Sequence, residues 1–532
     1  MPVWPKSICT FAVSLQTAAT EWKLRRKRSA PDAQARALAA LLPRLAATSH
    51  WRAAGVEAGL TYEKFRSRVP PGTPAQLAAA IARMQAGEAD VLWPGRCSLF
   101  ALTAGTSTGL PKAVPVTEEM LAHLRRGVAA TLLYYTVRAR NAGIFRGRHL
   151  LLGGSTALTP LGSGSPVNPT YNAEFSGILA IGLANWAERH LYEPGTAVAG
   201  IADWEKRLAE IVERTSSRDV TLVASLPNWL LLLVNELRAR CESRGRPIAH
   251  LQELWPNLEC YVHTGLPVAP FADELRLALG QSVKFHEVYT AAEGFVAVQD
   301  GDGPAAGLRL LADLGVFFEF IPVADYDETR IEHLGSKAVP LAGVQPGVDY
   351  AVLVTTPAGL VRTALGDVVR FVSIHPPRLV VVGRTALQLN SFGERLWEKD
   401  VSDSLVAVCA RHAWTIVNFH VAPLCEKTSL TGQVRGCHEW WVELKPGTVV
   451  TPTGPQIASE LDPELQRLNG DYAARRRAGA LDGPCVRLVM PGLFEHWLRH
   501  QNRWGGQHKL ARCANDRQIA DQLAQVSRFA RD

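Results

Sequence analysis

Residues 102–115 read LTAGTSTGLPKAVP, a short loop rich in glycine and hydroxyl side chains that carries one lysine. Gly105 and Gly109 allow the backbone to approach a ligand closely. Consecutive backbone N–H groups can bind an anion, and Lys112 adds a cation. Four hydroxyl side chains can donate to the same anion: Thr103, Thr106, Ser107 and Thr108. The spacing is not that of a Walker A motif, so these residues leave two interpretations open, a plain surface turn and a phosphate-binding loop.

The segments around the loop predict an α/β fold. The loop follows an apolar stretch that favours a strand (97–104) and precedes a helical pattern (116–137) in which Thr117 is a candidate N-cap. Strand-like and helix-like stretches then alternate as far as residue 290, which predicts α/β layers with a largely parallel sheet. Closely spaced strand patterns from 308 to 382 predict a β-rich subdomain.

A second, smaller lobe is expected after Arg384. Its pattern is a helix (395–412), two strands (414–424 and 438–447), one long helix (455–479) and a last strand (484–492), typical of a two-layer α+β lobe. With 532 residues the chain is too long for one core. We therefore predict two domains, residues 1–384 and residues 385–532.

Composition excludes several classes of protein. Hydrophobic residues make up 47% and charged residues 20% of the chain, which are ordinary globular values. The formal charge of +7 is modest, and the one basic run, KLRRKR (23–28), favours a solvated helix face over nucleic-acid binding. The nine cysteines are scattered without a CxxC pair, and no HExxH motif indicates zinc. The N-terminal apolar stretch lacks the charge order of a signal peptide, so we expect a cytoplasmic protein with no membrane or nucleic-acid partner and no obligate protein partner.

Three distant motifs bear on the loop. VYTAAEG (288–294) places Tyr289 and Glu293 at the end of a predicted strand, where a carboxylate can hold Mg²⁺ and a ring can contact a base. TTPAGLVRTALGDVVRF (355–371) contains Asp367, which can accept hydrogen bonds from a ribose but is also an ordinary turn residue. GGQHKLAR (505–512) carries Lys509, which alone would be an exposed lysine. Each motif is weak by itself.

Together and in this order, the motifs resemble those of the GH3 family of acyl-acid amido synthetases, which belongs to the adenylate-forming superfamily. LTAGTSTGLPKAVP is similar to the family's SSGTSxGxxKxxP, VYTAAE to YxxSE, and the Asp367 region to VTxxxGLYRYRxGDVV. LTYEKFRSRVP (60–70) with MQAGEADVLWPG (84–95) looks like the lead-in to the first motif, and the GGQHKLAR segment looks like the late GQxKxPR. The resemblance runs nearly end to end. It implies a luciferase-like architecture with a large N-terminal and a mobile C-terminal lobe.

The resemblance also implies a reaction, that of a ligase forming carbon–nitrogen bonds. A carboxylic acid attacks the α-phosphate of ATP to give an acyl-adenylate and pyrophosphate. An amine, typically from an amino acid, then attacks the acyl carbon and releases AMP. ATP and Mg²⁺ would be the cofactors, and the partners would be a small carboxylic acid and an amine or amino acid.

By the family pattern, the site residues divide by role. Lys509 and Lys112 are the candidate catalytic residues, and Glu293 is the candidate metal ligand. The loop residues that would hold the phosphates are Thr103, Gly105, Thr106, Ser107 and Gly109. The remaining candidate nucleotide-binding residues are Thr264, Gly265 and Tyr289 beside the adenine, Asp367 at the ribose, and Arg384 at the expected hinge.

The motifs also depart from the family pattern, and these departures leave alternatives open. Ala104 stands where the family has a serine, Ala291 and Ala292 precede Glu293, and Val361 replaces an aromatic residue. The alternatives are a superfamily ligase that passes its adenylate to CoA or a carrier protein, and a catalytically silent nucleotide-binding protein. The acid is not named by the sequence, although the region 151–233, from LLGGSTALTPLGSGSPVNPTYNAEF through SLPNWLLLL, is predicted to form the wall of its pocket.

Overall fold

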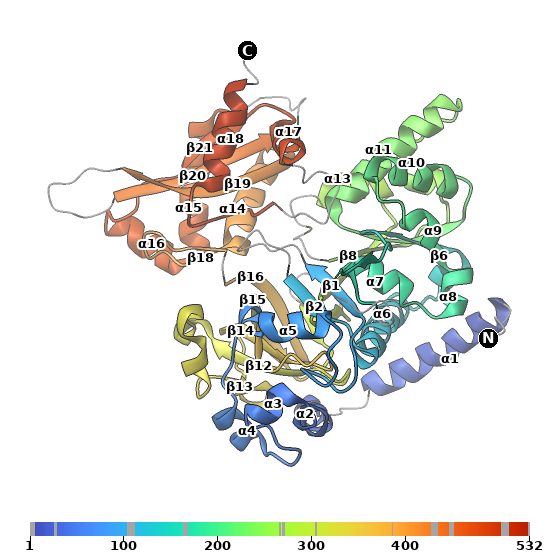
Figure 1. The fold of residues 1–532 in the computed structure, drawn as a ribbon. Coiled ribbons are helices and arrows are strands. Elements are labelled where there is room, and N and C mark those ends of the chain that lie inside the picture. Colours follow the sequence, from blue (N-terminus) through green and yellow to red (C-terminus); the bar gives the residue numbers. More distant parts are fainter. Residues whose placement is uncertain are drawn as a thin grey trace. The chain divides into compact units, whose positions relative to one another are not determined.

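The computed structural model describes residues 6–25, 29–103, 112–162, 169–264, 268, 272–303, 306–385, 387–426, 435–445, 452–501 and 510–529. The chain divides into two compact units. The first contains Met1–Leu266 and Leu275–Val381, and the second contains Pro267–Glu274 and Val382–Asp532. Figure 1 shows the elements of both units. The predicted mixture of α/β layers and a small α+β lobe is confirmed, whereas the predicted boundary at residue 384 stays a prediction.

A large mixed sheet organises the first unit. Within the described residues it has twelve strands in the order β13-β12-β14-β15-β16-β11-β10-β9-β8-β7-β3-β6. The pairs from β6 to β9 are parallel, and the pairs β9–β10, β10–β11, β11–β16, β14–β15, β12–β14 and β12–β13 are antiparallel. The sheet is therefore parallel in only one half. The predicted β-rich stretch continues this sheet, and its strands do not form a sheet of their own.

The strands of this sheet have the following bounds: β3 (Arg148–Leu152), β6 (Tyr192–Glu193), β7 (Val220–Ser225), β8 (Cys260–His263), β9 (Lys284–Ala291), β10 (Gly294–Gln299), β11 (Leu308–Leu310), β12 (Phe317–Pro322), β13 (Val339–Pro340), β14 (Asp349–Thr355), β15 (Thr363–Ile374) and β16 (Pro377–Arg384). The buried faces of β12, β14 and β15 are rich in Phe, Val and Leu, which suits strands packed into a core.

Helices also pack against the antiparallel part of the sheet, where α6 contacts β10 and α2 contacts β12. The first-unit helices are α1 (Lys6–Arg25), α2 (Ala30–Ala46), α3 (Ser49–Ala53), α4 (Tyr62–Arg68), α5 (Ala78–Gln85), α6 (Glu118–Ala139), α7 (Phe175–Ile181), α8 (Asn185–His190), α9 (Thr196–Ala199), α10 (Trp204–Thr215), α11 (Pro227–Ser243) and α12 (Leu251–Leu254). A further helix, α13 (Ala272–Leu279), is divided between the two units. As predicted, Thr117 caps α6, because its hydroxyl accepts the Met120 N–H.

The two strands that flank the phosphate-loop candidate lie in a separate small sheet. This sheet has the order β2-β1-β5-β4 among the described residues, with β1 (Leu99–Thr103), β2 (Lys112–Pro115), β4 (Thr159–Pro160) and β5 (Tyr171–Glu174). Strands β1 and β2 are antiparallel, with Thr103 opposite Lys112. The expected strand–loop–helix order is therefore wrong, because a short strand intervenes before α6. Four residues ending in proline are too few to give a clear strand pattern.

The second unit is a small α+β lobe. Its three-stranded sheet, counted over the described residues, contains β19 (Ile416–Glu426), β20 (Arg435–Leu444) and β21 (Cys485–Val489). A two-stranded ribbon of β17 (Gln388–Leu389) and β18 (Leu396–Trp397) precedes α14 (Glu398–Arg411). Two helices close the chain, α17 (Leu493–His500) and α18 (Gln518–Phe529), and no sequence pattern had been assigned to either.

One helix of the second unit differs from the prediction. The single helix expected over 455–479 is two helices, α15 (Gly454–Leu468) and α16 (Gly470–Arg477). Asn469 separates them, because its backbone is extended and its side chain accepts the Tyr472 N–H as the N-cap of α16.

Within the described part of the chain, no helix is long and apolar enough to cross a membrane.

Candidate functional site

Tyr289 and Asp367, two of the predicted nucleotide-binding residues, lie in direct contact. The Tyr289 hydroxyl donates a 2.7 Å hydrogen bond to Oδ2 of Asp367, and both side chains are 8% exposed. Strands β9 and β15 are four steps apart in the sheet order. Neighbouring strands are about 4.8 Å apart, so four steps across a flat sheet would separate the backbones by about 19 Å. The antiparallel half of the sheet must therefore curve to bring the two motifs together.

A bulge presents Asp367 at this point. Along β14 the pairing advances by two residues from Ala351 to Leu353, whereas along β15 it advances by four from Val368 to Ala364. The extra residues leave the ladder, and among them Gly366 has a φ of +80°. Glycine adopts this conformation without strain, so the Gly366–Asp367 pair aims the carboxylate away from the regular strand.

Glu293 occupies the tip of the hairpin that joins β9 to β10. Ala291 pairs with Gly294, so Ala292 and Glu293 form a two-residue turn. The Glu293 side chain is buried at 9% exposure. Tyr289 lies four residues earlier on the same hairpin, so both residues of the YxxSE-like motif are held by one structural element.

Unpartnered hydroxyl groups lie at the carboxyl ends of neighbouring parallel strands. Ser225 ends β7, Thr264 follows β8, and Thr290 lies near the end of β9. Their side-chain oxygens are buried and have no hydrogen-bond partner among the described residues. Buried hydroxyls without partners are costly, and ligands of α/β proteins bind at this edge of the sheet. Thr264 is one of the predicted nucleotide-binding residues, and Ser225 falls in the predicted wall of the acid pocket. Thr290 belongs to neither set, because an isolated hydroxyl at a strand end has no distinctive pattern.

The remaining predicted site residues are placed as follows. Lys112 begins β2 and is half-buried, opposite Thr103. Arg384 ends β16 and belongs to the second unit. The side chain of Thr103 and five further residues lie outside the described part of the chain: Gly105, Thr106, Ser107, Gly109 and Gly265.

Lys509 also lies outside the described residues, but the chain directly after it is well anchored. Ala511 accepts a 2.7 Å hydrogen bond from Nδ1 of His420, and the backbone of Val421 bonds to Arg512 and Ala514 on either side of Cys513. Cys513 Sγ donates to the Leu387 carbonyl at 3.0 Å, and Asn390 N–H donates to Asn515 Oδ1 at 2.8 Å. The segment that follows Lys509 is thus bonded both to β19 and to the residues that follow Arg384.

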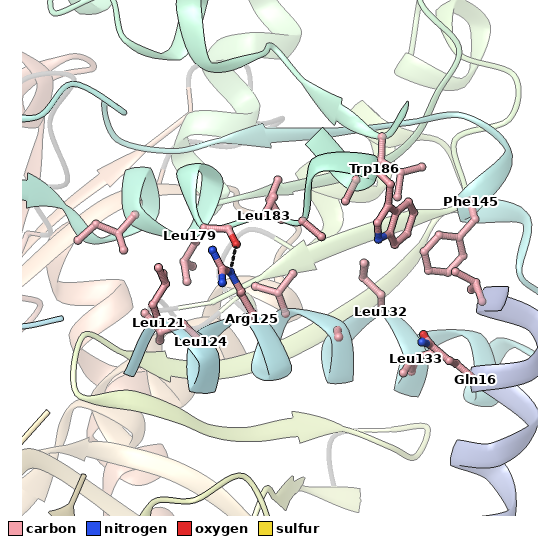
Figure 2. Close-up of a pocket in the computed structure, with 18 residues that line it drawn as sticks. Gln16, Leu121, Leu124, Arg125, Leu132, Leu133, Phe145, Leu179, Leu183 and Trp186 are labelled. Carbon is pink, nitrogen blue, oxygen red and sulfur yellow. Dashed lines mark hydrogen bonds between the residues drawn. The ribbon is translucent and has the colours of Figure 1, made fainter. Parts of the chain in front are cut away.

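A cavity of about 230 Å³ lies between α1, α6, α7 and α8 (Figure 2). Seven of its 18 lining residues are leucine, and Phe145 and Trp186 lie at one end. Among the described residues that line it, Arg125 is the one with a charged side chain. Its Nε donates to the Gly182 carbonyl, and no other hydrogen bond or ion pair of Arg125 exists among the described residues. Eight of the lining residues, from Ile178 to Leu191, fall within the region 151–233 that the sequence predicts as the wall, and that wall stays a prediction.

No group of three or more His, Cys, Asp or Glu side chains in the described ranges could hold a metal ion by itself. A site for Mg²⁺ would therefore need oxygen ligands from a substrate. Magnesium is commonly held in this way, by one or two carboxylates together with phosphate oxygens. A single buried carboxylate at the position of Glu293 fits that mode of binding.

Comparisons with known proteins agree with the motifs. The GH3 family N-terminal domain matches residues 22–198, the central domain residues 309–384 and the C-terminal domain residues 399–518. An indole-3-acetic acid-amido synthetase, GH3.8 from Oryza sativa subsp. indica, is 24% identical over 92% of this chain and 89% of its own. A jasmonoyl-L-amino acid synthetase, JAR6 from Nicotiana attenuata, is 24% identical over 91% of both chains.

A solved structure agrees with the fold. The GH3.15 acyl acid amido synthetase aligns over 99% of this chain and 97% of its own, with a TM-score of 0.72 at 18% identity. The three domain matches together cover more than half of the chain and follow the order of the motifs. The chain therefore belongs to the GH3 family.

Proposed function

We propose that this protein is an ATP-dependent acyl-acid amido synthetase. An oxygen of the acid carboxylate attacks the α-phosphorus of ATP, the bond to the β-phosphate breaks, and pyrophosphate leaves. A neutral amine then attacks the acyl carbon, the acyl–phosphate bond breaks, AMP leaves, and the amine proton passes to solvent. The Tyr289–Asp367 contact carries this proposal, because it joins two nucleotide motifs that are 78 residues apart.

Asp367 and Tyr289 would bind the nucleoside. A carboxylate offers about four acceptor positions, so Asp367 can accept from Tyr289 and from ribose hydroxyls together. Fixing the Tyr289 hydroxyl on the carboxylate also fixes the ring, whose face can lie against the adenine. The hydroxyls of Ser225, Thr264 and Thr290 provide further hydrogen-bonding groups along the same edge.

Glu293 would hold Mg²⁺ together with oxygens of the ATP phosphates. The ion would neutralise phosphate charge when bound. The loop after Thr103 would supply backbone N–H groups to the phosphates, with Lys112 at its end as a further cation. Lys509 would stabilise the charge that develops around the α-phosphate, and rotation near Arg384 would bring the second unit into each half-reaction.

The cavity between α6 and α7 would receive the apolar part of the acid. Ligand pockets are mostly apolar with a few polar groups that fix orientation, and Arg125 is such a group for a carboxylate. The available volume of about 230 Å³ suits a ring or a short chain. The relatives are named for indole-3-acetic acid and for jasmonate, so the acid differs within the family.

Pyrophosphate exchange tests the proposal. The protein would be incubated with ATP, Mg²⁺, labelled pyrophosphate and a panel of aryl, indolyl and aliphatic acids, and the appearance of labelled ATP would be measured. Acid-dependent exchange is the expected result. Adding amino acids, or CoA in a parallel sample, then identifies the acceptor by mass spectrometry. An amide supports the proposal, a thioester alone would make the protein a CoA ligase, and silence across the panel with AMP still bound would make it a nucleotide-binding protein.

A further inference from the structure

We propose that His123, a residue of α6 that touches neither substrate, positions Glu293 by holding the β9–β10 hairpin in one conformation. The inference rests on the proposed function, because it assigns a role within that same site. No sequence motif includes His123.

Both ring nitrogens of His123 are engaged, and their partners fix its protonation. The side chain is fully buried. The Leu314 carbonyl lies 2.9 Å from Nδ1 and can only accept, so Nδ1 carries the proton. The Phe295 N–H donates to Nε2 at 3.0 Å, so Nε2 must be unprotonated. Burial lowers the pKa of His123 to about 4, which keeps this neutral tautomer over the physiological range.

The bond to Phe295 reaches the hairpin two residues from Glu293. Phe295 lies at the start of β10, directly after the Ala292–Glu293 turn. The register shifts between Phe295 and Ala297, so the regular ladder is interrupted here and cannot by itself fix the turn. The bond from His123 supplies an anchor at the interruption.

The hairpin also packs closely on α6 around this bond. A Cβ atom added to Gly127 would lie 2.2 Å from Cγ of the Phe295 ring, and one added to Gly294 would lie 3.1 Å from Nε2 of His123. The two glycines therefore let the helix and the hairpin approach until the imidazole reaches the backbone. A displacement of the imidazole would be passed directly to the turn.

The other partner of His123 is itself rigid. Leu314 lies in the connection between β11 and β12, and its carbonyl also accepts from Arg126 at 2.9 Å. The buried Gln34 donates to the carbonyls of Ala312 and Val316 at 2.8 and 2.9 Å, and accepts from Phe318 N–H at 2.7 Å. His123 thus links the hairpin that carries Glu293 to the segment between β11 and β12, which is itself held by hydrogen bonds from Arg126 and Gln34.

The test compares three variants of His123 with a matched histidine. His123→Leu removes both bonds, His123→Asn keeps a donor for Leu314, and His123→Gln can keep an acceptor for Phe295. His286→Leu is the control, because His286 is also fully buried and neutral and donates to the Thr131 carbonyl at 2.9 Å, but does not contact the turn.

Two measurements are made on each protein. The first is amide hydrogen exchange of Phe295 in the nucleotide-free protein, by mass spectrometry or NMR. The second is the Mg²⁺ concentration that gives half-maximal acid-dependent pyrophosphate exchange. We expect His123→Leu to speed Phe295 exchange and raise the Mg²⁺ requirement roughly tenfold, the scale of one lost hydrogen bond. His123→Gln should restore most of the wild-type Phe295 exchange rate and Mg²⁺ requirement, and His286→Leu should change neither quantity.

The inference would be overturned if His123→Leu had the same Phe295 exchange rate and the same Mg²⁺ requirement as the wild type. It would also be overturned if His286→Leu changed both quantities as much as His123→Leu does. If His123→Leu does not fold, the contrast between the Gln and Asn variants decides the same question. Absence of pyrophosphate exchange in the wild type would count against the proposed function, whereas the amide-exchange arm would still test the anchor.

Discussion

Arg362 and Glu319 form an ion pair with two hydrogen bonds of 2.9 Å, and their side chains are 0% and 1% exposed. The same guanidinium donates to the carbonyls of Arg66, Val69 and Gly335, and Tyr62 donates to Glu319. Arg362 is the arginine of the GLVR segment. The structure therefore gives this motif residue a structural role, joining α4 to β12 and the turn before β15.

Removing one partner of this pair should strongly destabilise the first unit. Arg362→Met leaves Glu319 buried without its counter-ion, which typically costs about 3–5 kcal/mol. Urea unfolding followed by tryptophan fluorescence measures the loss. Arg370→Met is the matched control, because Arg370 makes a similar two-fold bond to Asp349 but is 43% exposed, and should cost at most about 1 kcal/mol. Equal losses in both variants would refute the structural assignment.

The Tyr289–Asp367 bond predicts separable effects on nucleotide affinity. Tyr289→Phe keeps the ring and removes one bond to a carboxylate, so ATP should bind about ten- to 150-fold more weakly, on the scale of about 1.5–3 kcal/mol for such a bond. Asp367→Ala also removes the proposed ribose acceptor and should weaken binding further. Calorimetric titration with ATP and with AMP measures the dissociation constant of each nucleotide. ATP affinity unchanged in Asp367→Ala would remove the residue from the nucleotide site.

The positive φ of Gly366 predicts that a side chain there is costly in two ways. Gly366→Ala forces a β-carbon into the left-handed region, at about 1–2 kcal/mol, and shifts Asp367 in the bulge. Gly347 has the same φ of +80° with no atom within 4 Å of an added Cβ, so Gly347→Ala should show the strain alone. Both should lower the melting temperature, whereas only the Gly366 variant should lose ATP affinity.

Three buried histidines and the half-buried His149, all in the first unit, predict sensitivity to acid. Burial lowers the pKa of His123, His149 and His263 to about 4 and that of His286 to about 3, below the ordinary 6.5 of an unfolded chain. The unfolded state thus binds more protons below pH 6.5, and stability should fall as the pH drops from 6.5 towards 4, by at most about 1.4 kcal/mol per pH unit for each histidine. Melting temperatures from pH 8 to pH 4 test this, and a flat profile below 6.5 would contradict it.

Lys509 should matter for chemistry more than for folding. Lys509→Ala removes a cation that is proposed to act on the transition state, so adenylation should slow by orders of magnitude while ATP affinity and melting temperature change little. Single-turnover formation of the acyl-adenylate is the relevant measurement. Lys445→Ala serves as a control for loss of a lysine in the same unit, and an unimpaired rate in Lys509→Ala would exclude the proposed role.

Prediction of structure from the sequence succeeds best where a local run of residues carries both a periodic pattern and a distinctive residue type. The strand that carries Tyr289 and the Thr117 cap are local patterns, and the structure has both of them. Gly366 and Asp367 lie in a bulge within β15, where the sequence suggested the start of a strand after a turn. Short elements are predicted poorly, as β2 shows, because four residues carry little periodic signal.

Features set by distant residues cannot be read from the sequence. The curvature that joins β9 to β15 follows from packing across several strands, and the role of His123 follows from two backbone groups more than 170 residues away. The break at Asn469 was a competition between helix propensity and a side-chain cap, which local propensity alone does not resolve.

The bonds of Cys513 and Asn515 have a mechanical consequence. They tie Leu387 and Asn390, which follow the junction at Val381–Val382, to Cys513 and Asn515. When torsion angles at the junction change, residues 510–515 should therefore follow residues 387–390 as one body. Asn515→Ala removes one of these two bonds, so it should leave each unit folded while it loosens the coupling between residues 387–390 and residues 510–515.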